Sequence, residues 1–173
     1  MPFAFLSRRR WLKWTLGAGG LLFMGGGGLF AARGRAPHVA GLRILSDQEH
    51  RTVAALARAI LPRGGAFSLG ARDVDLARAF DRFLADEPSW NQRDLRNAIF
   101  LLEMGPIVFD GRRVTFSHLS EAERLAHFEG WMRSGVLLRR QVAVAFKKFL
   151  HVVFYDTPEV WPSIGYDGPM FPA

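Results

Sequence analysis

The sequence predicts a mainly α-helical protein, an irregular bundle of about five helices, and three observations support this fold class. Apolar residues recur every three or four positions in five segments after residue 45, as they do on one face of a helix. Serine followed three residues later by glutamate or glutamine, the pattern of a helix-capping box, opens three of these segments. Proline or glycine ends most of them. We also expect one short β-hairpin-like link and an extended Pro/Gly-rich C-terminal tail.

The first two helices are expected between residues 46 and 88. Ser46 and Glu49 form the first capping box, and Pro62 ends the helix. The apolar stripe between them consists of Val53, Leu56, Ile60 and Leu61. Asp73 is expected to cap the second helix, which reaches Pro88. Its apolar positions are Val74, Ala77, Phe80 and Leu84.

A third helix and a hairpin are expected between residues 89 and 116. Ser89 and Gln92 form the second capping box, and Gly105 with Pro106 ends the helix. Residues 107–116 carry an Asp-Gly pair between apolar residues, which is typical of a two-residue hairpin turn. We therefore expect a small ribbon that links two helices.

The last two helices are expected between residues 120 and 155. Ser120 and Glu123 form the third capping box, and that helix ends at Gly135 with inward positions at Leu125, Phe128 and Met132. The longest helix runs from about Val136 to Tyr155, with apolar positions that include Leu137, Val144, Phe149 and Val152. Because it is apolar round much of its circumference, we expect it at the centre of the bundle.

Residues 155–173 contain four prolines and two glycines, which predicts an extended tail rather than a regular helix. Trp161, Tyr166 and Phe171 belong to residue types that are enriched in the cores of protein interfaces. We therefore predict these three as partner-binding residues. Alternatively, the tail folds back and fills a groove on its own bundle, and the two arrangements can hold for different halves of it.

The N-terminal stretch has the order of an export signal. Its basic part ends at Lys13, and the uncharged apolar run Trp14–Ala32 follows. The basic part resembles the twin-arginine signal, on the residues Ser7, Arg8, Arg9, Trp11, Leu12 and Lys13. This resemblance implies that the twin-arginine (Tat) translocase exports the folded protein and that these are its targeting residues. We therefore divide the chain into an export signal (1–36), a linker (37–45) and a helical domain (46–173).

The apolar run has a second interpretation. Trp14–Ala32 reaches the roughly 18 uncharged residues that suffice for a membrane-spanning helix. An uncleaved run would hold the protein at the inner membrane, whereas cleavage would release the body into the periplasm. The sequence leaves both outcomes open.

Composition excludes several functions. Residues 1–36 carry six basic and no acidic side chains, so only +1 of the net charge of +7 belongs to the body and nothing supports nucleic-acid binding. The absence of cysteine excludes disulfides, thiolate catalysis, iron–sulfur clusters and c-type haem attachment. No two of the five histidines have the i, i+4 spacing of a helical metal site, and the nearest approach is His118, Glu123 and His127. We expect no catalytic, cofactor-binding or metal-binding residue in this chain.

Three short motifs carry a family resemblance. They are Leu45–Glu49 with its continuation through Ala55–Ala57 to Ile60–Pro62, the box Leu119–Arg124, and the closing Ile164–Pro169. Together they resemble the gluconate 2-dehydrogenase subunit 3 family, with Asp167 as a departure where proline is expected. The resemblance implies a small, largely helical accessory subunit of a membrane-associated dehydrogenase, and it leaves catalysis to other subunits.

The resemblance also implies the partners. The larger subunit is an FAD-containing flavoprotein of the glucose-methanol-choline (GMC) oxidoreductase type, often with a multi-haem cytochrome c as third subunit. In such complexes the small subunit carries the Tat signal, and the flavoprotein is exported as its passenger. Two other functions stay open: a membrane-anchored structural tether with an uncleaved N-terminal helix, and a small exported enzyme with its own cofactor.

Overall fold

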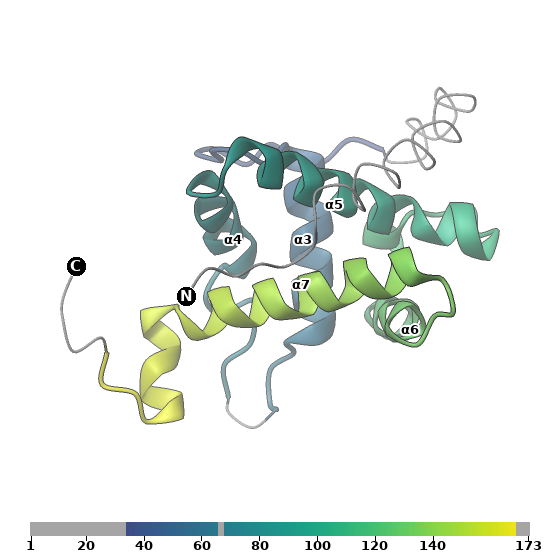
Figure 1. The fold of residues 1–173 in the computed structure, drawn as a ribbon. Helices are drawn as coiled ribbons and strands as arrows, with labels where there is room; N and C mark the ends of the chain where they lie inside the picture. The colour runs from purple at the N-terminus through teal and green to yellow at the C-terminus, as the bar shows by residue number, and fades with distance from the viewer. Residues whose placement is uncertain (1–33, 66–67, 169–173) are drawn as a thin grey trace. The chain divides into compact units, whose positions relative to one another are not determined.

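The fold was analysed in a computed structural model, which describes residues 34–65 and 68–168. The chain divides into two compact units, Met1–Gly34 and Arg35–Ala173, and the fold described here is that of the second (Figure 1). The elements are α3 (Asp47–Ile60), α4 (Leu76–Ala85), α5 (Ser89–Asp110), η1 (Phe116–His118), α6 (Glu121–Met132), α7 (Leu137–Tyr155) and η2 (Pro158–Ile164), where η marks a 3-10 helix. No strand occurs among the described residues, so the mainly helical prediction is confirmed.

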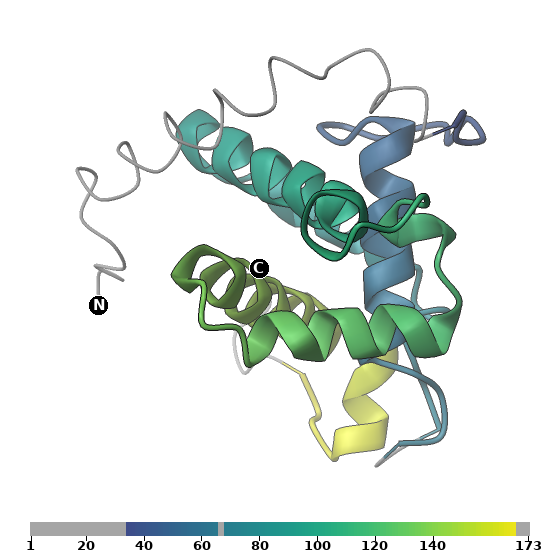
Figure 2. The same cartoon turned by 90° about the vertical axis from the view of Figure 1, so that its right-hand side faces the viewer.

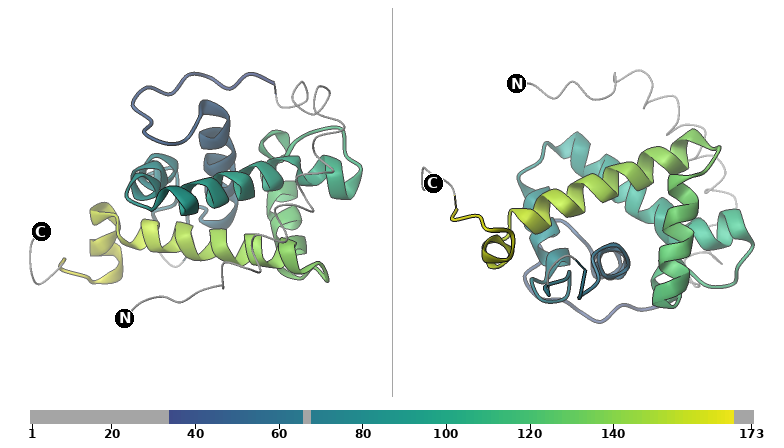
Figure 3. Two further views of the ribbon diagram at one scale, coloured as in Figure 1. Left: turned by 45° about the horizontal axis from the view of Figure 1, so that its top comes forward. Right: turned by 90° about the horizontal axis from the view of Figure 1, so that it is seen from below.

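Helix α3, not α7, occupies the centre of this unit. It packs against α4, α5, α6 and η1, whereas α7 packs against α4, α6 and η2. Figures 1 and 3 show α7 running at a steep angle to α3, and Figure 2 shows α6 crossing α3. Seven of the 14 residues of α3 are buried, and most of them are small. The expectation that α7 is central was wrong, because an apolar circumference does not reveal which of its faces other helices cover.

Two of the three predicted capping boxes are present. The Ser46 hydroxyl accepts the Glu49 N–H at 3.3 Å, and the Glu49 carboxylate accepts the Ser46 N–H at 2.7 Å. Ser120 and Glu123 make the same reciprocal pair at 3.4 and 3.0 Å. The starts of α3 and α6 are therefore set by local hydrogen bonds that the sequence alone predicts.

The other two predicted helix starts need correction. Asp73 does not cap α4, because its carboxylate accepts the Gly70 N–H at 2.8 Å and pairs with Arg63. Residue Asp75 precedes α4 instead. Ser89 does not cap α5 either, since Pro88 precedes that helix without a side-chain hydrogen bond and the Gln92 amide donates to the Glu87 carbonyl at 2.9 Å. Asp73 has the right residue type for a cap but bonds to another local partner, and Ser89 is the first residue of α5 instead of its cap.

The predicted hairpin at 107–116 is not formed. Helix α5 continues through Gly105 and Pro106 to Asp110, and Gly111 follows it with a left-handed φ of 64°. The Gly111 N–H then bonds to the Pro106 carbonyl, which closes the helix end. A hairpin turn and a helix C-terminus both need a glycine with positive φ, so the Asp-Gly pair fits either. Gly105 and Pro106 are buried within α5, and this burial favours the helix over the hairpin.

The first half of the predicted extended tail is a 3-10 helix. Pro158 and Pro162 both lie in η2, which tolerates them because it is short and proline at its start needs no N–H partner. The side chain of Val160 is fully buried, and η2 packs against α7. This half therefore folds back on its own bundle. The end of the tail, from residue 169, lies outside the described residues.

Two buried carboxylates hold the elements together. Asp81 of α4 accepts the backbone N–H groups of Arg43, Ile44 and Leu45 at 2.7, 3.0 and 2.8 Å, so the predicted linker is bonded to the bundle. Burial alone would raise the pKa of Asp81, but these three bonds outweigh it and lower the pKa. Glu103 of α5 is also fully buried.

Candidate functional site

The predicted partner-binding residues Trp161 and Tyr166 lie together. Their rings meet edge to face with centroids 5.3 Å apart, and the Trp161 indole N–H donates to the Tyr155 carbonyl at 3.0 Å. Gly168, with φ +107°, lies against the same indole, because a Cβ there would come within 3.2 Å of it. The indole is thus fixed in place while the Tyr166 side chain stays 46% exposed. Phe171 lies outside the described residues.

These aromatic residues belong to a larger exposed apolar area, which we name the C-terminal apolar surface. Its exposed members are Val152, Tyr155, Ile164 and Tyr166, at 58%, 41%, 40% and 46% exposure. Residues three apart in a 3-10 helix lie above one another, so Trp161 and Ile164 share one side of η2. The surface therefore continues from the end of α7 onto η2, which Figure 1 shows at the end of the described chain.

The same surface extends along α7. The exposed apolar residues of this helix are Leu137, Val144, Val152 and Tyr155. They are spaced by seven, eight and three positions, which places them on one face of the helix. The opposite face packs into the core through Val142, Phe146, Leu150 and Val153. Helix α7 thus has one face buried in the core and an opposite, exposed face on which these four apolar residues lie beside Gln141 and Lys148.

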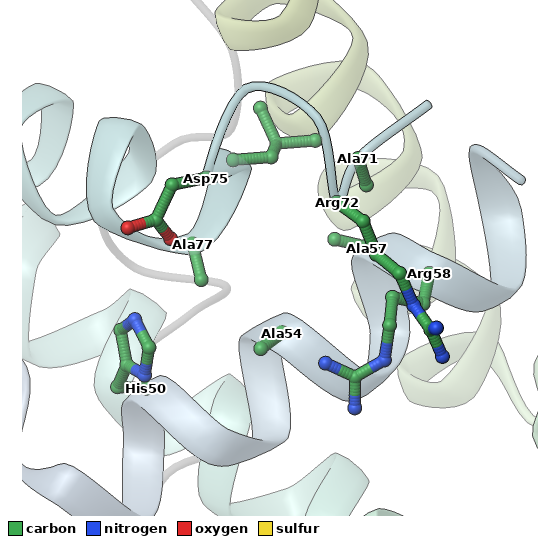
Figure 4. Close-up of a pocket in the computed structure, with 9 residues that line it drawn as sticks. His50, Ala54, Ala57, Arg58, Ala71, Arg72, Asp75 and Ala77 are labelled. Carbon is green, nitrogen blue, oxygen red and sulfur yellow. The ribbon is translucent and has the colours of Figure 1, made fainter. Parts of the chain in front are cut away.

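A second feature is a hollow between α3 and the start of α4 (Figure 4). It measures about 220 Å³. Its floor is made of small apolar side chains, namely Ala54, Ala57, Ala71, Leu76 and Ala77. Arg58 and Arg72 lie on one side of the hollow, and His50 and Asp75 lie on the other.

Arg58 lacks a counter-ion. It makes no hydrogen bond or ion pair with any described residue, although it is half-buried. Burial lowers its pKa, the positive charges of Arg124 and Arg72 lower it further, and the negative charge of Glu121 opposes them without an ion pair to Arg58. Arg72 pairs with Glu121 at 2.6 Å, and Arg124 donates to the Ser117 carbonyl at 3.2 Å. Of these three guanidinium groups, Arg58 alone faces the hollow without a polar partner.

The opposite side of the hollow is also unusual. The Nε2 atom of His50 is buried and has no hydrogen-bond partner among the described residues, and burial lowers the pKa of this imidazole. Asp75 has a φ of 42°, the only positive φ of a non-glycine residue in the described chain, and it pairs with Arg78 at 3.1 Å. Such backbone strain gathers at functional sites. The sequence does not reveal this hollow, although His50, Ala54, Ala57 and Arg58 have the spacing of one helical face.

The histidines named in the sequence do not come together as ligands. His118 bonds to the Thr115 hydroxyl at 2.8 Å, Glu123 is held by Ser120 and Arg112, and His127 bonds to Asp110 at 2.7 Å. Across the described residues no group of three or more His, Asp or Glu side chains could hold a metal ion.

The predicted targeting residues Ser7, Arg8, Arg9, Trp11, Leu12 and Lys13, and the run Trp14–Ala32, lie outside the described residues. Among the helices that are described, none has the length and apolar character needed to cross a membrane. No protein-family model, curated protein or solved structure matches this chain. The family resemblance therefore stays a prediction made from the residues.

Proposed function

We propose that this chain is the non-catalytic small subunit of a periplasmic FAD-dependent dehydrogenase complex. Its role is to carry the Tat signal and to escort and stabilise a GMC-type flavoprotein subunit. The observation that supports this role best is the C-terminal apolar surface, with Trp161 fixed in place and Tyr166 exposed beside it.

An exposed apolar stripe of this kind favours partner binding over a role in isolation. Single exposed apolar residues are ordinary, but contiguous ones mark interaction surfaces. Tyr and Trp carry much of the binding energy at interfaces, and a ring that is already fixed loses little freedom on binding. A stable complex needs roughly 1,000 Å² or more of buried surface. The exposed face of α7 together with η2 provides the apolar part of such an area on one side of the bundle.

The proposed escort works in two steps. The helical body folds in the cytoplasm and binds the folded, FAD-loaded partner, and the Tat signal then directs the pair through the translocase together. After export the body stays bound at the inner membrane or in the periplasm. Binding to the native state stabilises the partner by RT ln(1 + [L]/Kd). In this proposal FAD belongs to the partner subunit and haem to a third, cytochrome c subunit.

Co-purification with the flavoprotein tests the proposal. The double variant Val152→Ser/Tyr166→Ser removes two exposed apolar side chains without touching the buried core. We expect it to retain less than about a tenth of the flavoprotein, since each lost anchor costs on the order of 1–2 kcal/mol of binding. Val114→Ser is the matched control, because Val114 is 43% exposed and follows the end of α5 that lies away from η2 (Figures 1 and 3).

Circular dichroism and the urea midpoint establish that each variant is folded. Retention of the flavoprotein by the double variant at the level of the unmodified chain would overturn the role of this surface. The tether alternative predicts an intact N-terminus, which mass spectrometry of the mature chain measures. The exported-enzyme alternative predicts flavin or haem absorbance in the purified chain alone.

A further inference from the structure

We propose that the hollow between α3 and α4 binds the carboxylate of a short aliphatic monocarboxylate, with Arg58 as its anchor. This inference does not rest on the proposed function. It rests on the arrangement of charge, volume and unpaired polar atoms around the hollow.

Charge comes first. Arg58, Arg72 and Arg124 are close enough to influence one another, and Glu121 is the acidic side chain that pairs with one of them. Arg58 is left half-buried beside two like charges with no described partner of its own. A buried or half-buried charge is costly unless it is paired, so the side of the hollow formed by Arg58 and Arg72 favours an anion. A planar guanidinium matches a carboxylate with two parallel hydrogen bonds.

The volume and floor of the hollow then restrict the rest of the ligand. The volume of about 220 Å³ accommodates a small ligand, so we expect a short chain. The floor formed by Ala54, Ala57, Ala71 and Ala77 has no side-chain hydrogen-bonding group. It therefore suits methylene groups.

The far side of the hollow selects against a second negative charge. Asp75 lies there beside His50, and its carboxylate, which pairs with Arg78 at 3.1 Å, offers no positive partner to a second carboxylate of the ligand. The imidazole of His50 lines the same side, although its unpaired Nε2 atom is buried behind the lining. The ligand class is therefore a monocarboxylate with a short, uncharged chain, and dicarboxylates of the same length bind less well.

The same carboxylate chemistry has two sources, a free acid or the C-terminus of another protein chain. Calorimetry on the full-length protein distinguishes them. Butyrate, butyramide and succinate serve as free probes, and a short peptide is compared as its free acid and its C-terminal amide. We expect butyrate to bind at least tenfold tighter than butyramide and tighter than succinate if the source is a free acid. Binding of the peptide acid but not its amide, without butyrate binding, assigns a chain terminus.

Variants connect binding to the hollow. Arg58→Gln removes the anchoring charge and should weaken binding at least tenfold, and Ala54→Leu should abolish it by filling the floor at a half-buried position. Arg113→Gln is the matched control. Arg113 is exposed, does not line the hollow and lies far from Arg58 in the sequence. The proposal is overturned if none of the carboxylate probes binds, or if folded Arg58→Gln binds them as tightly as the unmodified chain.

Discussion

At the scale of single residues, Glu103 shows how much one buried carboxylate can connect. It accepts hydrogen bonds from the Thr52 hydroxyl at 3.1 Å, the Ser117 N–H at 3.0 Å and the Ser117 hydroxyl at 2.7 Å. Its other neighbour is Arg51, at 3.9 Å. These contacts join α3, α5 and η1, which lie far apart in the sequence.

We expect Glu103→Ala to lower the free energy of unfolding by about 3 kcal/mol, because it leaves buried donors without an acceptor and Arg51 without its counter-ion. The exposed Glu129, which pairs with Arg133 at 3.1 Å, is the control, and Glu129→Ala should cost under about 0.5 kcal/mol. Urea denaturation measures both. Equal losses in the two variants would contradict the connecting role of Glu103.

His127 makes stability depend on pH. Its side chain is only 4% exposed, and its Nε2 atom is buried without a partner among the described residues. Burial lowers its pKa below 6.5 despite the opposing hydrogen bond that His127 donates to Asp110, and burial lowers the pKa of His50 as well. Because the unfolded chain binds these protons more readily, the contribution is complete above pH 6.5 and is lost as pH falls through the folded pKa.

The urea midpoint should therefore fall between pH 7.5 and pH 5.5, and the double variant His50→Gln/His127→Gln should show a smaller fall. The stability that depends on ionised carboxylates is lost only at lower pH, since the pKa values of Asp73 and Glu123 are about 2. A midpoint that stays constant across this range in the unmodified chain would rule out the histidine effect.

The sequence predicted Trp161 and Tyr166 as partner-binding residues, but it did not predict that Arg58 and His50 line a hollow. Aromatic residues in a Pro/Gly-rich segment stand out in any sequence. An unpaired arginine does not, because its lack of a partner depends on the elements that surround it in the fold. The same holds for the buried carboxylates of Asp81 and Glu103, whose partners lie 14 to 51 positions away.

At the scale of elements, substitutions at the three predicted N-cap serines distinguish residues that cap a helix from one that does not. Ser46→Ala and Ser120→Ala should each cost about 1 kcal/mol of unfolding free energy, since each hydroxyl accepts a backbone N–H. Ser89→Ala should cost much less, because Ser89 lies inside α5 and caps nothing. Thermal or urea unfolding of the three variants checks this order. A large loss for Ser89→Ala would restore the capping box that the sequence predicts there.

Two glycines provide a matched test of how α5 meets α6. A Cβ on Gly105 would lie 2.6 Å from Trp131 and 2.8 Å from His127, whereas a Cβ on Gly130 would meet nothing within 4 Å. Gly105→Ala should therefore destabilise the protein by about 1–3 kcal/mol through overpacking. Gly130→Ala should stabilise it by up to about 1 kcal/mol, since alanine favours a helix interior. Stabilisation by both substitutions would show that the two helices do not approach this closely.

Sequence patterns predicted the positions of all five α-helices in the described part of the chain, but not their ends or neighbours. The capping boxes of α3 and α6 are local, and these predictions were accurate, whereas Leu125 of α6 was predicted to face inward and is 40% exposed. The C-terminal end of α5 was predicted too early. Pro106 lacks a backbone N–H, but it and neighbouring residues are buried, which favours continuing the helix to Asp110. The centre of the bundle was misassigned because four apolar residues of α7, namely Leu137, Val144, Val152 and Tyr155, are exposed in the described chain.

At the scale of the whole molecule, the proposal joins an exposed apolar surface to an N-terminal export signal. The body has no cysteine, so packing, hydrogen bonds and ion pairs hold it together without a disulfide. A body of this kind can fold before export, which the Tat route requires by the stated resemblance. In this proposal, the flavoprotein that is exported with the body binds the exposed face of α7.

The location of the flavoprotein tests this account most directly. Arg8→Lys/Arg9→Lys replaces the arginine pair of the signal and keeps its charge, and Arg112→Lys/Arg113→Lys makes the same change within the body. Dehydrogenase activity in the periplasm and inner-membrane fractions is measured for both. We predict that the first variant leaves the flavoprotein in the cytoplasm and that the second exports it normally. Normal export of the flavoprotein with the first variant would contradict the account.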